Sequence, residues 1–349
     1  MTMLFDDLHA AMRARTPNFE NLLAVLRQEE PARPTLFEFF LNGPLYARLA
    51  GAPWPGGDDP VAALRWQLTA FRNAGYDYCT TSGSDFSFPT KAYHHQASMS
   101  QNECATITDH ASFEAYQWLS PDDFDYSRLD AIAPDLPEGM KLIVHGPGGV
   151  LENVTFLMGF DNLCFAIADD PDFAQAVFDA VGSRLVRYYE ICAPKATVGA
   201  LISNDDWGHK TQTMLSLADM RKYVFPWHQR IVETIHAAGK PAILHSCGNL
   251  ERVMDEIIDD MGYDGKHSYE DTIMPVEEAY ERWGRRIAIL GGIDVDFICR
   301  STPEAIRARC KAMLARTKGR GAYALGTGNS VPPYVPDEGY FAMTGAVIE

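Results

Sequence analysis

The chain has 349 residues, 46% of them hydrophobic, and its 47 acidic and 30 basic side chains give a formal net charge of −17. A chain of this size and composition can bury the core of one domain. Its acidity, without any basic block, argues against a nucleic acid or an anionic membrane as a partner. No stretch approaches the roughly 20 apolar residues that cross a bilayer, so we expect a cytoplasmic protein. The seven cysteines are odd in number and scattered, which argues against a disulfide framework.

Short β-rich runs alternate with amphipathic stretches along most of the chain, a pattern that predicts βα units and a parallel sheet. Eight strands are expected, at residues 35–39, 76–80, 142–145, 200–203, 242–245, 263–266, 287–290 and 322–325. Helical patterns lie between them, at residues 60–73, 172–189, 217–238, 250–259, 276–283 and 303–315.

Glycines mark the ends of five of these helices, where a left-handed C-cap favours that residue: Gly75, Gly239, Gly262, Gly284 and Gly319. Residues 82–140 interrupt the alternation with a long stretch rich in Ser, Asp and Pro. We therefore predict a single α/β domain over residues 1–349. Its expected architecture is a (β/α)8 TIM barrel with an elaborated loop region, an insert or lid at 82–140, before the third strand.

Polar or glycine-rich segments follow seven of the predicted strands, at residues 83–85, 146–152, 204–208, 245–249, 267–271, 291–294 and 326–329. In a parallel barrel, the loops after the strands meet on one face, where the reactive groups of barrel enzymes lie. This face is therefore the predicted site.

His245 and Cys247 lie two residues apart where a predicted strand ends. An imidazole nitrogen and a thiolate at this spacing can face one ion, and both suit zinc. Two other interpretations remain open. One is a buried cysteine beside a histidine that caps the loop, and the other is a cysteine nucleophile whose thiol pKa the histidine lowers.

Four runs from about residue 200 onward resemble, in order, the landmarks of the uroporphyrinogen decarboxylase superfamily: SNDDWGHKTQTMLS, AAGKPAILHSCGNL, IAILGGIDVD and GTGNSVPPYVPDEGYFAM. That superfamily includes zinc-dependent methyltransferases that act on methyl-corrinoid proteins. The resemblance is strong over the C-terminal half, looser at 17–50 and 141–165, and not recognisable at 82–140.

The resemblance points away from true uroporphyrinogen decarboxylation. Decarboxylases of the superfamily hold the carboxylates of their tetrapyrrole with arginines after the first strand. Here the corresponding stretch, FEFFLNGPLYARLAG, contains only Arg48, and Thr327 stands where the decarboxylase has a histidine. An acidic chain without the arginine pair is also poorly suited to a highly anionic porphyrinogen.

The methyltransferase branch has a His-x-Cys pair that His245 and Cys247 match, so the resemblance implies zinc at these two residues. That branch adds a cysteine in the last loop, which this chain lacks, so an oxygen ligand is expected to complete a zinc site. The candidate ligands are Glu152, Asp206, Glu270 and Asn329.

Three carboxylates are catalytic candidates. Asp206 is preferred because the aligned aspartate of the family points into the cavity, whereas its neighbour Asp205 is expected to cap a loop or helix start. Asp85 resembles the aspartate that the decarboxylase directs at pyrrole nitrogens, with loop capping as the alternative. Glu152 is an isolated carboxylate after a glycine-rich turn, and is either functional or turned to solvent.

Four residues are expected to contact the substrate: Trp207, Tyr269, Thr327 and Asn329. His267, Glu270 and Asp271 end the sixth predicted strand, where a surface cluster is as good an interpretation as a functional one.

The leading hypothesis is a methyltransferase of the methyl-corrinoid type. Zinc would activate a small-molecule methyl acceptor, and a partner protein would carry the corrinoid (cobalamin) cofactor. The first alternative is a decarboxylase or other lyase that acts on a smaller carboxylated substrate without a cofactor. The second is a non-catalytic protein that binds a corrinoid or tetrapyrrole.

Overall fold

The computed structural model describes residues 2–90, 102 and 105–348, so part of the predicted insert lies outside the described residues. Within the described residues, seven strands form one curled, parallel sheet whose neighbours follow chain order. Seven of the eight predicted strands are confirmed to within a few residues. The strands are β1 Tyr78–Ser82, β2 Lys141–His145, β3 Val198–Asn204, β4 Ala242–His245, β5 Gly265–His267, β6 Ala288–Leu290 and β7 Tyr323–Ala324.

The predicted first strand, residues 35–39, is not a strand of the sheet. The segment forms one isolated parallel bridge, between Leu36 and Leu325, just beyond β7. On its other side, the Tyr78 hydroxyl of β1 takes up both backbone groups of Glu38, at 2.6 Å from the nitrogen and 2.8 Å from the carbonyl oxygen. Because a side chain satisfies these groups, no backbone ladder joins the segment to β1, and the prediction of eight strands was wrong here.

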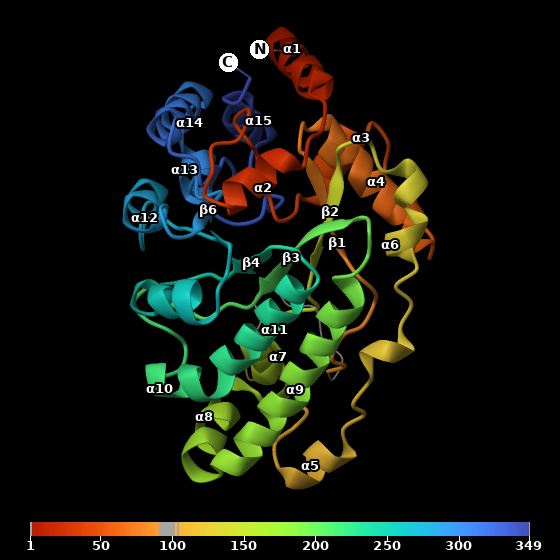
Figure 1. Ribbon diagram of the computed structural model, residues 1–349, viewed down its shortest axis with the longest axis vertical. Coiled ribbons are helices and arrows are strands. Elements are labelled where there is room, and N and C mark those ends of the chain that lie inside the picture. Colours follow the sequence, from red (N-terminus) through yellow and green to blue (C-terminus); the bar gives the residue numbers. More distant parts are fainter. Residues whose placement is uncertain (1, 91–101, 103–104, 349) are drawn as a thin grey trace.

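Four helices precede the sheet: α1 Thr2–Ala14, α2 Glu20–Leu26, α3 Gly43–Ala50 and α4 Pro60–Asn73. The bounds of α4 match the prediction, because Asp59 accepts from the backbone of Val61 and Ala62 and proline occupies the first helical position. Figure 1 shows these helices in the upper half of the molecule, with α1 packed against the last helix, α15 Asp337–Gly345.

The connection from β1 to β2 holds the predicted insert. Its described part contains α5 His110–Ala115, η1 Pro121–Asp123, α6 Arg128–Ala131 and η2 Ala133–Asp135, and it runs along one side of the molecule (Figure 1). Three helices, α7 Val150–Met158, α8 Phe160–Asp169 and α9 Pro171–Cys192, then lead to β3.

The predicted helix at 217–238 is interrupted. It consists of α10 Leu217–Asp219, a π-turn η3 Met220–Val224 and α11 Phe225–Ala237. Pro226 at the start of α11 explains the break, because proline has no N–H to continue the helical bonds. The predicted helix at 250–259 is likewise replaced, by a 3₁₀-turn η4 Glu251–Val253 and a π-turn η5 Glu256–Asp260.

The remaining helices are α12 Val276–Trp283, α13 Val295–Arg300 and α14 Pro303–Thr317. Of the five predicted glycine C-caps, Gly284 is wrong, since its φ is −62°. The other four glycines have the expected left-handed backbone, with φ values of 72° to 82°.

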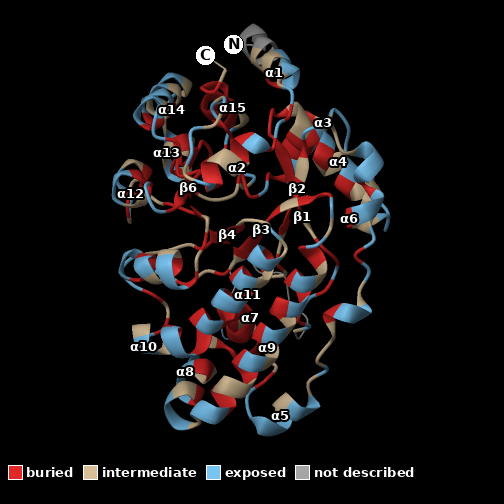
Figure 2. Cartoon of the chain, in the orientation of Figure 1, coloured by how far each residue is buried: buried red, intermediate tan, exposed pale blue. Residues whose placement is uncertain are grey.

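Buried residues gather in the strands and on the helix faces turned toward them (Figure 2). Among the described residues, no single helix is both long and apolar enough to cross a membrane. The bent pair α7 and α8, which meet at 96°, satisfies the two criteria only when taken together.

The register of the central strands positions the site. Asn204 at the end of β3 lies beside His245 at the end of β4, and His245 lies beside His267 at the end of β5. Because all the ladders are parallel, the loops after these strands begin at the same edge of the sheet.

Candidate metal centre

Three side chains with different donor atoms converge after β3 and β4. Asp206, His245 and Cys247 each place one donor atom within 4.8 Å of the others. The Nε2 atom of His245 lies 3.9 Å from the Cys247 sulfur and 4.0 Å from the Asp206 oxygen. Of the four candidates for an additional ligand, Asp206 is the one that this cluster contains.

The two loops that carry the cluster are joined through their backbones. Gly208 N–H donates to the Cys247 carbonyl at 3.1 Å, and Asn249 N–H donates to the His209 carbonyl at 2.7 Å. Gly248 has φ +88°, and a Cβ there would lie 2.1 Å from the carbonyl carbon of Gly208. Glycine is therefore required at position 248 for the loops to approach this closely.

Burial sets the charge state of His245. Its ring packs against Phe39, with centroids 4.7 Å apart, and its Nδ1 lies 2.8 Å from Nδ1 of His267. Burial, and then the neighbouring His267, keep the pKa of His245 well below its usual range, and burial lowers the pKa of His267 to about 3. Both imidazoles are therefore neutral at physiological pH, the form in which histidine binds a metal.

Cys247 lies in a polar surrounding that holds its sulfur in place. The Asn329 side-chain nitrogen donates to the sulfur at 3.3 Å, and the Ser268 hydroxyl lies 3.5 Å away. The backbone N–H of Cys247 donates to Asp206 at 2.8 Å. Burial, and then the Asp206 charge, raise the pKa of the Cys247 thiol to about 12. The protein alone therefore favours the thiol, which argues against Cys247 as an unaided nucleophile.

The donor set fits a zinc ion. Nitrogen, sulfur and carboxylate oxygen are all zinc ligands, and ligand atoms about 2.0–2.3 Å from one tetrahedral ion lie about 3.3–3.7 Å apart. The observed separations of 3.9 and 4.0 Å are a few tenths of an ångström wider, within the reach of small side-chain rotations.

Asp205 is structural, as predicted. Its carboxylate is fully buried and accepts from the backbone of Leu151 and Glu152, both at 2.9 Å, at the start of α7. The same carboxylate lies 2.9 Å from Nε2 of His228 on α11. Asp205 therefore fixes α7 relative to the sheet, and with it the position of Glu152.

Glu152 is half-buried close to the cluster. It accepts from Gly149 N–H at 3.0 Å. Burial, followed by the charges of Asp205 and Asp206, raises the pKa of Glu152 to about 8. Burial also raises the pKa of Asp206. Glu152 thus holds a proton near neutral pH, which is the state of a general acid.

The structure does not bring Asp85 or Trp207 to the cluster. The Asp85 side chain is 82% exposed and pairs with Arg128. Trp207 is fully buried, with its ring edge-on to His228 at 4.7 Å. The Trp207 ring therefore belongs to the packed core beneath the loop. Its backbone N–H donates to the Ser246 hydroxyl at 3.2 Å.

Tyr269 and Asn329 line a cavity of about 1090 Å³ that adjoins the cluster through Asn329. Thr327 is fully buried and bonds to Glu38, 2.7 Å from its hydroxyl. Two other predicted residues at the end of β5, His267 and Asp271, have different surroundings. His267 is buried, so a surface cluster is wrong for it, whereas Asp271 is held by Arg309 at 2.6 Å.

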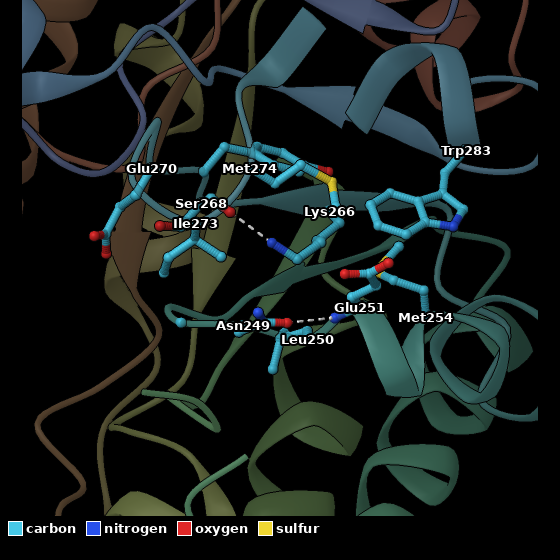
Figure 3. A pocket seen from close by; sticks show the side chains of 12 residues that line it. Asn249, Leu250, Glu251, Met254, Lys266, Ser268, Glu270, Ile273, Met274 and Trp283 are labelled. Atoms are coloured by element: carbon cyan, nitrogen blue, oxygen red, sulfur yellow. Dashed lines mark hydrogen bonds between the residues drawn. The ribbon is translucent and has the colours of Figure 1, made fainter. Parts of the chain in front are cut away.

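Lys266 and Glu38 are buried ionisable groups that the sequence analysis does not single out. Lys266 lines a narrow pocket of about 30 Å³ and donates to the Ser268 carbonyl at 2.5 Å. Figure 3 shows this bond, with the Glu270 carboxylate pointing away from Lys266. Burial lowers the pKa of Lys266 to about 8 and raises that of Glu38 to about 8. A single charge inside an apolar run, as in TLFEFFL, was the available signal for Glu38.

The one arginine of the 37–51 stretch, Arg48, pairs with Asp337 at 2.5 Å. The arginine is therefore engaged in an ion pair within the fold.

Comparison with known proteins agrees with the fold. A curated uroporphyrinogen decarboxylase from Anaeromyxobacter sp. (strain Fw109-5) is 27% identical over 191 residues, 54% of this chain and 51% of that protein. The match therefore spans about half the length of this relative. A methyltransferase from Methanosarcina mazei shares the fold, with a TM-score of 0.69 at 15% identity over 95% of this chain and 98% of that one. The family described as Uroporphyrinogen decarboxylase (URO-D) matches residues 20–349, and the chain therefore belongs to this family.

Proposed function

We propose that this protein is a methyltransferase in which zinc, held by Asp206, His245 and Cys247, activates a small-molecule methyl acceptor. The methyl group would come from a corrinoid (cobalamin) carried by a partner protein at the face that bears the strand exits. The observation that carries the proposal is the convergence of nitrogen, sulfur and oxygen donors at this face. The fold that the chain shares with a methyltransferase from Methanosarcina mazei supports the proposal.

Each ligand has a distinct task in this proposal. His245 offers a neutral nitrogen, Cys247 a sulfur fixed by Asn329, and Asp206 a carboxylate fixed by the Cys247 N–H. Asp206, His245 and Cys247 would hold the ion, and zinc with three protein ligands would supply Lewis-acid chemistry that lowers the pKa of the acceptor.

We assign the proton transfer to Glu152. The acceptor must lose its proton to become a nucleophile, and with a pKa of about 8 the deprotonated form of Glu152 would take up that proton near pH 8. The bond from Gly149 and the fixed start of α7 hold the carboxyl in place. The acceptor would enter through the cavity that Tyr269 and Asn329 line.

A decarboxylase or lyase of a smaller carboxylated substrate is the second candidate, favoured by the family itself. Asp206 rather than Asp85 would be its charged group, because Asp206 lies against the buried cluster while Asp85 is exposed and paired with Arg128. Such an enzyme would keep its activity in the presence of chelators.

Zinc content tests the proposal. We expect near-stoichiometric zinc, by inductively coupled plasma mass spectrometry, in native protein purified without a metal-affinity tag. His245→Ala and Cys247→Ala should lose it, while Cys310→Ala, which removes a buried thiol on α14, should retain it. Native protein that stays free of metal after incubation with zinc would contradict the proposal.

The chemical step has its own measurement. Zinc-loaded protein should demethylate methylcobalamin in the presence of 2-mercaptoethanol, and Glu152→Gln should slow this reaction without releasing zinc. Decarboxylase activity that survives chelation would favour the second candidate instead.

A further inference from the structure

His267 lies directly behind the metal ligand His245, in a fully buried position. The Nδ1 atoms of the two rings are 2.8 Å apart, and the other nitrogen of His267 lies 3.3 Å from the carbonyl oxygen of Thr327. A carbonyl oxygen can only accept, so Nε2 of His267 must carry a hydrogen.

This assignment fixes the second ring. If His267 also carried a hydrogen on Nδ1, it would be a buried cation with no carboxylate on either nitrogen, which is costly. Nδ1 of His267 is therefore an acceptor, and Nδ1 of His245 is the donor between the rings. Nε2 of His245 then carries no hydrogen, and its lone pair faces Cys247 and Asp206.

Thr327 anchors this chain of bonds. Its carbonyl also accepts from Gly292 N–H at 2.8 Å. Gly291 permits the approach, since it has φ +68° and a Cβ there would lie 2.2 Å from the Thr327 oxygen and 3.0 Å from the His267 ring. The backbone around His267 is thus shaped for this contact.

The Thr327 hydroxyl connects these bonds to a second metal ligand, Cys247, through Asn329. It contacts both the Asn329 carbonyl and Glu38, and it has a single hydrogen to donate. Because a carbonyl only accepts, the hydrogen goes to Asn329, and a protonated Glu38 donates to the hydroxyl. The Asn329 side chain in turn donates to the Cys247 sulfur at 3.3 Å.

We infer that His267 is a positioning residue that holds His245 in the Nδ1–H tautomer, and that Thr327 links this bond to the one that fixes Cys247. The inference rests on the metal centre proposed above. Its physical basis is that a second hydrogen bond to a ligating histidine fixes both the tautomer and the orientation of its ring.

The tautomer can be read without any metal. Nuclear magnetic resonance of 15N-histidine-labelled native protein should show His245 with hydrogen on Nδ1 and none on Nε2. His267→Phe, which keeps a ring against Phe37, should abolish this fixed state. An Nε2–H tautomer in the native protein would overturn the inference, whether or not the protein binds zinc.

Zinc affinity gives the second readout, by competition of Zn²⁺ with a chromophoric chelator. His267→Phe should weaken binding about 10–100-fold. His267→Asn, whose oxygen can still accept from His245, should recover most of that loss. His145→Phe is the matched control, because His145 also packs against Phe39 but lies outside these bonds. Native affinity in His267→Phe would refute the positioning role, whereas a native protein that binds no zinc contradicts only the proposed function.

Discussion

Two buried histidines, His228 and His245, differ in the partners of their ring nitrogens. His228 on α11 has partners on both nitrogens, Tyr263 at 2.8 Å and Asp205 at 2.9 Å. His245 at the end of β4 has one nitrogen fixed by His267 and the other turned to Cys247 and Asp206. Burial alone therefore does not identify a ligand. The useful signal is a ring with one satisfied nitrogen and one left open toward other donors.

The comparison assigns the two regions different roles. The Asp205 carboxylate is hydrogen-bonded to His228 and to two N–H groups of α7, so its oxygens are already engaged within the fold. The ligands around His245 keep free lone pairs at the edge of a cavity. We therefore expect changes near His228 to act on stability, and changes near His245 to act on metal binding.

Asp205→Ala should have the largest effect on stability, about 3–5 kcal/mol, because it leaves His228 and two helix N–H groups buried without a partner. Urea denaturation followed by circular dichroism measures the loss. Variant protein that remains folded in the cold should still bind zinc, because no metal ligand is removed. An unchanged urea midpoint would contradict the structural role.

Glu38→Gln tests the protonation state of the buried Glu38 carboxyl, which contacts Thr327 in the loop after β7. The native pKa of Glu38 is raised from 4.5 to about 8, so the unfolded chain releases this proton at lower pH than the folded protein does. The contribution of Glu38 to stability is thus fully present below about pH 4.5 and is lost as pH rises toward 8.

Because glutamine has no proton to lose, Glu38→Gln should exceed the native protein in stability by about 3–4 kcal/mol at pH 8. The two should converge near pH 4.5. Urea titrations at a series of pH values measure this difference. A gap that stays constant with pH would show that Glu38 ionises normally.

Asp85→Asn should have the smallest effect, below about 1 kcal/mol, because the Asp85 side chain is 82% exposed in its pair with Arg128. Thermal unfolding measures the change. Turnover in the same variant tests the catalytic role suggested by sequence, and a loss of tenfold or more at unchanged stability would show that Asp85 takes part in the reaction.

The parallel sheet was predictable because its strands are short apolar runs between helical patterns, and seven of them lie where expected. The exception, residues 35–39, reads as a strand in sequence. Its missing ladder depends on the Tyr78 hydroxyl, a partner about 40 positions away whose contact no local pattern reveals. Likewise, Pro226 marks a break in the predicted helix, but not the π-turn that precedes it.

The sequence predicts site residues that lie close together along the chain. It does not predict the direction in which a side chain points or a contact between distant residues. The spacing of His245 and Cys247 identified the pair, and Asp206 was among four oxygen candidates. Trp207 follows Asp206 directly yet points into the core, because a turning loop sends neighbours to opposite sides. Glu38 and Thr327 lie 289 positions apart, so no spacing in the sequence could have paired them.

Where Gly208 and Gly248 approach closely, the backbone contacts that join the two loops are distinct from the side chains that would bind the metal. Two main-chain bonds, from Gly208 to Cys247 and from Asn249 to His209, join the two loops without using the Asp206 or Cys247 side chain. A different side chain at position 206 or 247 therefore leaves these bonds in place. The fold can exchange one donor set for another at this edge while both glycines stay, which is one route by which a single scaffold hosts several reactions.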